Sequence, residues 1–213
     1  MTNAKAWFFS LIGFLSILFL IALVLPRSQQ ELFLAENGVV ESLTFISYLV
    51  CLALIVKQRA WEWIKSRWHL LAIIALLALR EADFHVLFTG QSIFRTKLYL
   101  DPESPLLVVV TGMAVIFFIL WLFFYVLKKY GAGLIQDAMN RVASANFILL
   151  AILFVVFSKS IDGITRKLDV LNIKISKSVE YSIMQLEEIT ELGIPLSLCI
   201  AVMLYFSQRR TSD

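Results

Sequence analysis

Charged residues are scarce in this sequence. Asp, Glu, Lys and Arg make up 16% of its 213 residues, whereas soluble domains contain about 25%. Hydrophobic residues account for 60% of the chain, against about 45–50% in soluble domains. These proportions exclude an ordinary soluble domain, and 213 residues leave no room for one beside a membrane domain. The formal net charge of +3 lies mostly in short loops, so no nucleic-acid partner is indicated.

Cysteine is also rare. Cys51 and Cys199 both fall inside apolar stretches, which predicts small core residues rather than a disulfide or a metal site. No internal repeat and no cleavable signal are evident: the apolar run 7–25 is longer than a signal-peptide core and lacks an A-x-A-like cleavage site. The short loops and the absence of N-glycosylation sequons favour a bacterial inner (plasma) membrane.

What the chain has in abundance is long apolar runs. Each approaches the roughly 20 residues that a helix needs to cross a bilayer. We therefore predict one all-α domain over residues 1–213, a polytopic integral membrane bundle of about six transmembrane helices. The predicted spans are 7–25, 38–56, 68–88, 105–127, 146–165 and 188–207. Apolar residues at helical spacing within the polar segment 160–187 predict an amphipathic arm near the outer headgroups, although an ordinary connecting helix explains them equally well.

Basic residues set the expected orientation. They concentrate at both termini and in the loops 57–67 and 128–145. These residues are Lys5, Lys57, Arg59, Lys65, Arg67, Lys128, Lys129, Arg141, Arg209 and Arg210. The positive-inside rule assigns all four segments to the cytoplasm, and six spans make that assignment consistent. Both termini are therefore predicted to be cytoplasmic.

Ionisable residues within the predicted spans form a second small group. Alternating span directions place all of them in the outer half of the membrane. They are Glu41, Arg80, Glu81, Asp83, His85, Lys159, Asp162, Glu187, Glu188 and Glu191. Arg80 and Glu81 follow Trp68 by about 12 residues, or roughly 18 Å of helix, within a bilayer core about 30 Å thick. Ionisable groups at such depth cost about 2.5–3.5 kcal/mol each and usually face a bundle interior or a wet cavity.

Helical spacing pairs the charges of the third span. Glu81 and His85 are four residues apart on one face, and Arg80 and Asp83 are three apart on another. Two polar faces favour a central position for this span. The four residues are the predicted catalytic group: Glu81 or His85 as general acid or base, and Arg80 as the ligand of a phosphate or carboxylate. The structural alternative is a buried salt-bridge network that fixes helix register.

The last predicted span begins with a group of acidic residues. Glu187 and Glu191 are four residues apart and would repel unless a proton, a metal ion or a base offset them. A solvated helix start explains them equally well. Pro195 removes a backbone donor one turn later, which predicts a kink beside the acids.

A divalent metal ion is the one cofactor that these residues suggest. Carboxylates with one imidazole suit Mg, Ca or Mn, or Zn in a mixed site. The candidate ligands are Glu41, Glu81, His85, Asp162, Glu187, Glu188 and Glu191. No H-E-x-x-H motif, E-x-x-H pair or cysteine cluster supports them. The two histidines also exclude the three-histidine zinc site of membrane hydrolases that resemble alkaline ceramidase.

Three functions remain open at this point. The first is a membrane-embedded enzyme acting at the outer leaflet on a lipid or lipid-linked substrate. The second is a non-catalytic subunit or assembly factor that binds a membrane-protein partner. The third is an ion- or proton-coupled transporter, which is disfavoured because the cytoplasmic halves of the spans carry almost no ionisable residues. An open site with a reactive group favours the enzyme, and a closed, fully paired network favours the subunit.

Overall fold

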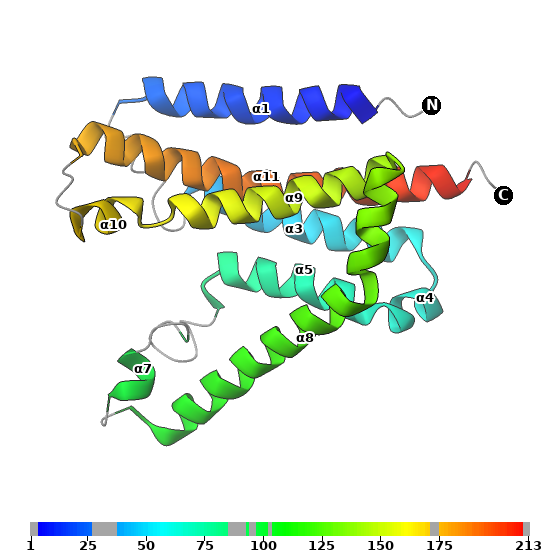
Figure 1. The fold of residues 1–213 in the computed structure, drawn as a ribbon, viewed down its shortest axis with the longest axis horizontal. Helices are drawn as coiled ribbons and strands as arrows, with labels where there is room; N and C mark the ends of the chain where they lie inside the picture. Colours follow the sequence, from blue (N-terminus) through cyan, green and yellow to red (C-terminus); the bar gives the residue numbers. More distant parts are fainter. Residues whose placement is uncertain are drawn as a thin grey trace.

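The structure, a computed structural model, is helical throughout the part of the chain that it describes (Figure 1). That part comprises residues 4–26, 38–84, 93, 97–101, 104–170 and 175–210, without the side chains of 97, 165, 166, 170, 209 and 210. The helices are α1 (Ala4–Val24), α3 (Val39–Gln58), α4 (Trp61–Ser66), α5 (Trp68–Glu81), α7 (Lys97–Leu100), α8 (Leu106–Met139), α9 (Ala143–Ile161), α10 (Ile164–Val170) and α11 (Lys177–Arg210). The predicted all-α fold is confirmed.

Five of these helices are long and apolar enough to cross a membrane: α1, α3, α8, α9 and α11. The chain is therefore an integral membrane protein by composition and fold. The predicted third span differs from expectation, because α5 has 14 residues, about 21 Å, against a core of about 30 Å. Asp83 adopts a positive φ of 44°, which an α-helix of L-residues does not tolerate. Residues 85–88 of that span lie outside the described residues.

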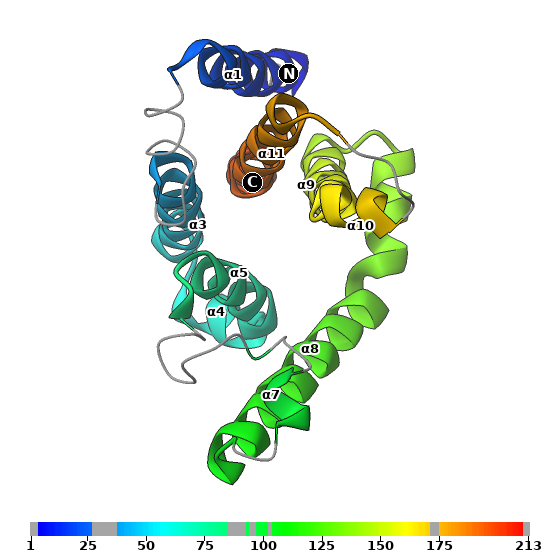
Figure 2. The ribbon, with the colours of Figure 1, turned by 90° about the vertical axis from the view of Figure 1, so that its left-hand side faces the viewer.

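Helix α11 occupies the centre of the bundle. It packs against α1, α3 and α9 (Figures 1 and 2). Within its most apolar 18-residue window, 72% of the residues are buried, against 11% for α8. The sequence favoured a central third span, but α5 instead packs on the outside of α3. Buried small residues at four-residue intervals, Gly193, Ser197 and Ala201, explain the difference, because they let neighbouring backbones approach α11 closely.

Two apolar clusters hold the bundle together. One joins α1, α9 and α11 through residues such as Leu15, Phe147 and Leu192. The other joins α3, α5 and α11 and contains Cys51 and Cys199, which are free, buried thiols. The large apolar side chains that remain exposed are spread along α1, α3, α8 and α9, as expected where lipid rather than protein covers a helix.

The connection before α11 differs from a single amphipathic arm. Helix α9 ends at Ile161, and Gly163 has a φ of 61°, a left-handed turn that suits glycine. Residues 164–170 form the separate helix α10, and α11 begins at Lys177. From there α11 continues to Arg210 as one helix, so Pro195 lies within an uninterrupted element.

Helix α8 joins the bundle near the end that carries both termini. There, the buried His69 of α5 lies 2.7 Å (Nε2 to hydroxyl oxygen) from Tyr130 of α8, and the two rings stack. Both chain termini, the end of α3 and the start of α9 lie at this same end (Figure 1). The opposite end holds the turn between α9 and α10 and the start of α11, and we call it the distal end.

The close approach at Gly193 gives a test of the packing. A Cβ there would lie 2.8 Å from Cε2 of Phe154 and 3.1 Å from Cδ1 of Leu15. Gly193→Ala should lower the free energy of unfolding by about 1–2 kcal/mol, because overpacking outweighs the gain in helix propensity. Gly13→Ala is the matched control, because a Cβ there meets nothing within 4 Å, and it should be neutral or stabilising. Denaturant titration in mixed micelles measures both; equal effects would contradict this packing.

Candidate functional site

Glu191 of α11 is the centre of the charged site. Its Oε1 accepts hydrogen bonds from Arg80 Nη2 at 2.7 Å and from Ser158 Oγ at 2.8 Å. Lys159 Nζ lies 3.2 Å from the same oxygen. The donors come from α5 and α9, and the Glu191 side chain is only 9% exposed. One carboxylate oxygen therefore connects three helices.

Local packing explains why these groups meet. Glu191 precedes Gly193 by two residues, and Phe154 of α9 lies directly over that glycine. Four residues later, α9 therefore presents Ser158 to the same region of α11. Helix α5 is positioned by its packing on α3, because Ala78 of α5 lies in the apolar cluster that contains Tyr48 of α3 and Ile194 of α11. Arg80 then reaches Glu191 across the remaining space, and a third of its side chain stays exposed (34%), as snorkelling cations commonly do.

Glu81 lies beside this centre but is paired less completely. Its side chain is 6% exposed, and its Oε1 lies 3.6 Å from Arg80 Nη2, which is an ion-pair contact too long for a strong hydrogen bond. Arg80 is thus shared between two carboxylates and is closer to Glu191. The almost fully buried Tyr48 of α3 lies within electrostatic range of both carboxylates and of Arg80.

Further acids surround the pair. Glu188 interacts electrostatically with Glu41, Glu81, Glu187 and Glu191. At the more exposed edge of this group, Asp162 forms an ion pair with Lys159 at 3.1 Å. The charge of Asp162 also interacts with that of Glu187. We call the whole group the distal acidic cluster. Its members are Glu41, Glu81, Asp162, Glu187, Glu188 and Glu191, with the bases Arg80 and Lys159. Lys167 adds a third base at the edge, where its Nζ donates to the backbone oxygen of Asp162 at 2.9 Å, so the acids of this group outnumber the bases among the described side chains.

One of the predicted site residues stands apart from this cluster. Asp83 is exposed and lies beyond the end of α5, so the helical face that it was expected to share with Arg80 ends before reaching it. His85 lies outside the described residues. The other candidates, which come from α3, α5, α9 and α11 and the turn after α9, do gather at the distal end.

The structure adds a constraint on the metal site. Within the described ranges, no three His, Cys, Asp or Glu side chains are grouped closely enough to hold a metal ion. Glu191 directs one oxygen at three donors, and these compete with any cation for that oxygen. The metal site, for which His85 was the imidazole ligand, stays a prediction.

Two participants were missed by the sequence analysis. Ser158 is fully buried and donates to Glu191; its position next to Lys159 was the available signal. Tyr48 follows Glu41 by seven residues on α3, two helical turns along the same face. Ser158 and Tyr48 are both found by searching the predicted spans for polar residues that are adjacent to a charged residue or lie on the same helical face as one.

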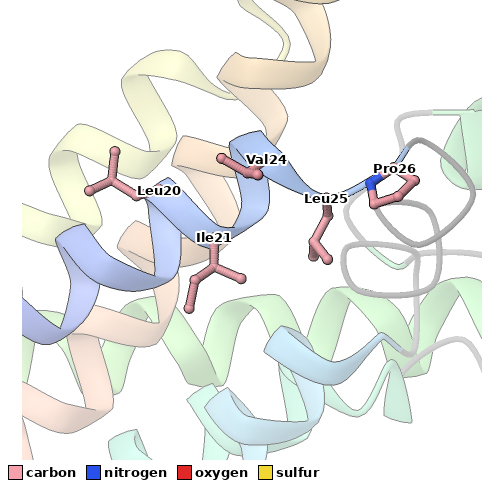
Figure 3. Close-up of a pocket in the computed structure, with 5 residues that line it drawn as sticks. All are labelled: Leu20, Ile21, Val24, Leu25 and Pro26. Atoms are coloured by element: carbon pink, nitrogen blue, oxygen red, sulfur yellow. The ribbon is translucent and has the colours of Figure 1, made fainter.

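A hollow on the surface of α1 lies near the same end but differs in chemistry. Its lining is apolar and consists of Leu20, Ile21, Val24, Leu25 and Pro26 (Figure 3). None of these side chains can exchange a proton or bind an ion. The hollow is therefore purely apolar, and any acid–base chemistry at the distal end rests on the acidic cluster.

Comparisons with protein-family models, with curated proteins and with solved structures find no match to this chain. The arrangement must be interpreted from its own chemistry. A carboxylate held by three donors lies next to a buried carboxyl group with fewer contacts, and carboxyl pairs in unequal surroundings are the usual basis of acid–base assignments. Proton transfer is the reaction that these groups can support without any further component.

The contact between Arg80 and Glu191 can be tested by a double-mutant cycle. We expect a coupling energy of about 1–3 kcal/mol for Arg80→Gln with Glu191→Gln, because the two groups share a buried hydrogen-bonded network. The matched control is Lys65→Gln with Glu62→Gln, an exposed pair 3.4 Å apart that should couple by roughly 0–1 kcal/mol. Unfolding free energies of the four variants of each cycle give the result. Coupling no larger than the control would show that this contact does not organise the bundle.

Proposed function

We propose that this protein is a membrane-embedded enzyme that acts on a lipid or lipid-linked substrate at the distal end of the bundle. Glu81 is the general acid or base, and Arg80 holds an anionic group of the substrate. The observation that carries the proposal is the unequal pairing of two neighbouring carboxyl groups: Glu191 takes three donors, whereas Glu81 shares one of them at 3.6 Å.

The unequal pairing supports a division of labour. Glu191 is a permanent acceptor, since its oxygen is the target of Arg80, Ser158 and Lys159. Glu81 is buried with acids on several sides, and such a group exchanges a proton more readily than one fixed by three donors. A hydroxyl or a water molecule placed beside Glu81 would pass its proton to this carboxylate as its oxygen attacks the substrate.

The bases support the choice of substrate. A guanidinium carries five N–H donors, and Arg80 directs Nη2 at Glu191 while a third of its side chain is exposed. Lys159 is exposed to 45%. The two cations therefore face both the buried acids and the headgroup region. A phosphate or carboxylate on a lipid headgroup would find donors there, within reach of Glu81.

The charge distribution supports the orientation. The basic segments 57–67 and 128–145, which the sequence predicted as loops and which are largely helical in α4 and α8, lie with both termini at the end opposite the distal acidic cluster (Figure 1). We propose that this basic end is cytoplasmic in a bacterial inner membrane, according to the positive-inside rule. The distal acidic cluster then faces the outer leaflet and the periplasm.

A second candidate function is favoured by a different feature of the same site. Oε1 of Glu191 is closed off by its three donors, which suits a non-catalytic subunit or assembly factor that needs only a fixed shape to bind a membrane-protein partner. The two functions differ in what Glu81 does. A purely structural network needs Glu81 only for its packing, whereas an enzyme needs its proton.

Glu81→Gln therefore provides the test of activity. The wild-type protein, reconstituted in vesicles of lipid extracted from cells that produce it, should convert a lipid that mass spectrometry detects as substrate loss and product gain. Glu81→Gln keeps the shape of the side chain but cannot carry the proton, and it should lower conversion at least 100-fold. Glu62→Gln, exposed at the opposite end, should convert like the wild type. Unchanged lipids with all three folded proteins would reject the enzyme and favour the subunit.

The orientation has its own test. Both native cysteines are buried, so single cysteines introduced at exposed positions report accessibility. Ser178→Cys, at the exposed start of α11, should react with a membrane-impermeant maleimide on intact spheroplasts. Ser66→Cys, exposed at the end of α4, should react only after the membrane is opened. The reverse pattern would place the distal acidic cluster in the cytoplasmic leaflet.

A further inference from the structure

A second group of charges lies at the basic end of the bundle. Arg59, just after α3, lies among aromatic rings from α4 and α11. Its guanidinium carbon is 4.6 Å from the ring centre of Phe206, 5.6 Å from that of Trp63 and 6.0 Å from that of Tyr205. The rings of Trp63 and Phe206 also contact each other edge to face. The cation is thus held by aromatic faces.

A second guanidinium lies against the same indole ring. The guanidinium carbon of Arg67 lies 4.7 Å from the ring centre of Trp63. Contact with an aromatic face stabilises a cation, but it does not neutralise the charge. Both guanidinium groups therefore keep their charge beside the same indole ring, and an anion within reach of both would stabilise them.

The described part of the chain does not provide that anion. Glu62 is the one acid of the loop 57–67; it is directed at Lys65, 3.4 Å away, and its side chain is 84% exposed. None of the ion pairs among the described residues includes Arg59 or Arg67. In addition, Nε of Arg59 and Nε1 of Trp63 are buried without a hydrogen-bond partner. Buried donors left without a partner are destabilising.

The surroundings indicate where the missing acceptor comes from. Trp61 and Trp68 flank the group and are 65% and 45% exposed, as is typical of side chains at the headgroup level. Val56, three residues before Arg59 on α3, is 53% exposed and leads from the charges toward the apolar part of the helix. An anion with an attached acyl chain fits both features, whereas a free ion would leave the apolar surface unused.

We infer that Arg59, Arg67 and the indole N–H of Trp63 bind the phosphate of an anionic phospholipid in the leaflet at the basic end. The non-ester oxygens of the phosphate accept from the two guanidinium groups, which are well suited to phosphate. A small side-chain adjustment brings the indole N–H to the same group. The acyl chains lie along Val56 on the lipid-facing side of α3. This site is separate from the distal acidic cluster and does not depend on the proposed reaction.

Lipid retention by the purified full-length protein tests the inference. Native mass spectrometry from a neutral detergent should show phosphatidylglycerol bound at least ten times more tightly than phosphatidylcholine. The double variant Arg59→Gln/Arg67→Gln should lose that preference. The matched control Lys57→Gln/Lys65→Gln removes the same charge from the same loop and should keep it. Equal retention of both lipids, or equal loss in both double variants, would overturn the inference.

Two additional measurements test the indole contact and the identity of the bound anion. Trp63→Phe preserves the aromatic face but removes the donor, so phosphatidylglycerol should bind severalfold more weakly even if the arginine variants fail to fold. Unchanged binding by a folded Trp63→Phe variant would count against the indole contact. Inorganic phosphate is titrated against the bound lipid: displacement only at concentrations far above that of the lipid supports the lipid assignment. Displacement at equal concentrations would assign the site to a free anion.

Discussion

The structure depends on one carboxylate, that of Glu191, being satisfied inside a membrane bundle. Because α11 is the central helix, this charge cannot reach water by itself, and an unpaired ion at such depth is strongly destabilising. Its donors must come from neighbouring helices. Arg80 and Ser158 can reach it only when α5 and α9 present specific faces to α11, so the ionic contact fixes helix rotation, which apolar packing alone specifies weakly.

The same contact determines what is left for chemistry. Once Arg80 and Lys159 are directed at Glu191, the remaining acids of the distal acidic cluster outnumber the bases. Glu81 keeps a shared, longer contact with Arg80, and Glu188 lies among four other acids. Among the described side chains, such an excess is compensated by protons or by further cations. In the proposed enzyme, the structural and reactive roles are therefore coupled, because the network that fixes the fold leaves its neighbours available for chemistry.

Much of this could be predicted from the sequence, for reasons that differ between features. Apolar runs located the five long helices, and the alternating directions of the six predicted spans placed Glu41, Glu81, Asp162 and Glu191 in the same half of the membrane. Hydropathy says nothing about which helix is central, and the charges of the third span pointed to the wrong one. The small residues at Gly193 and Ser197 decide that question through backbone approach. The early end of α5 at Asp83 depends on one backbone angle, which a hydrophobic run does not reveal.

The two charged groups also define how deep the distal acidic cluster lies. Glu191 and Phe206 belong to the same helix and are 15 residues apart, which corresponds to about 22 Å along the axis. If Phe206 and Arg59 mark the headgroup level of one leaflet, Glu191 stops several ångströms short of the other surface of a core about 30 Å thick, and any tilt increases that depth. A water-soluble substrate would have to enter the membrane to reach Glu81, whereas the headgroup–glycerol region of a lipid is already close to that level.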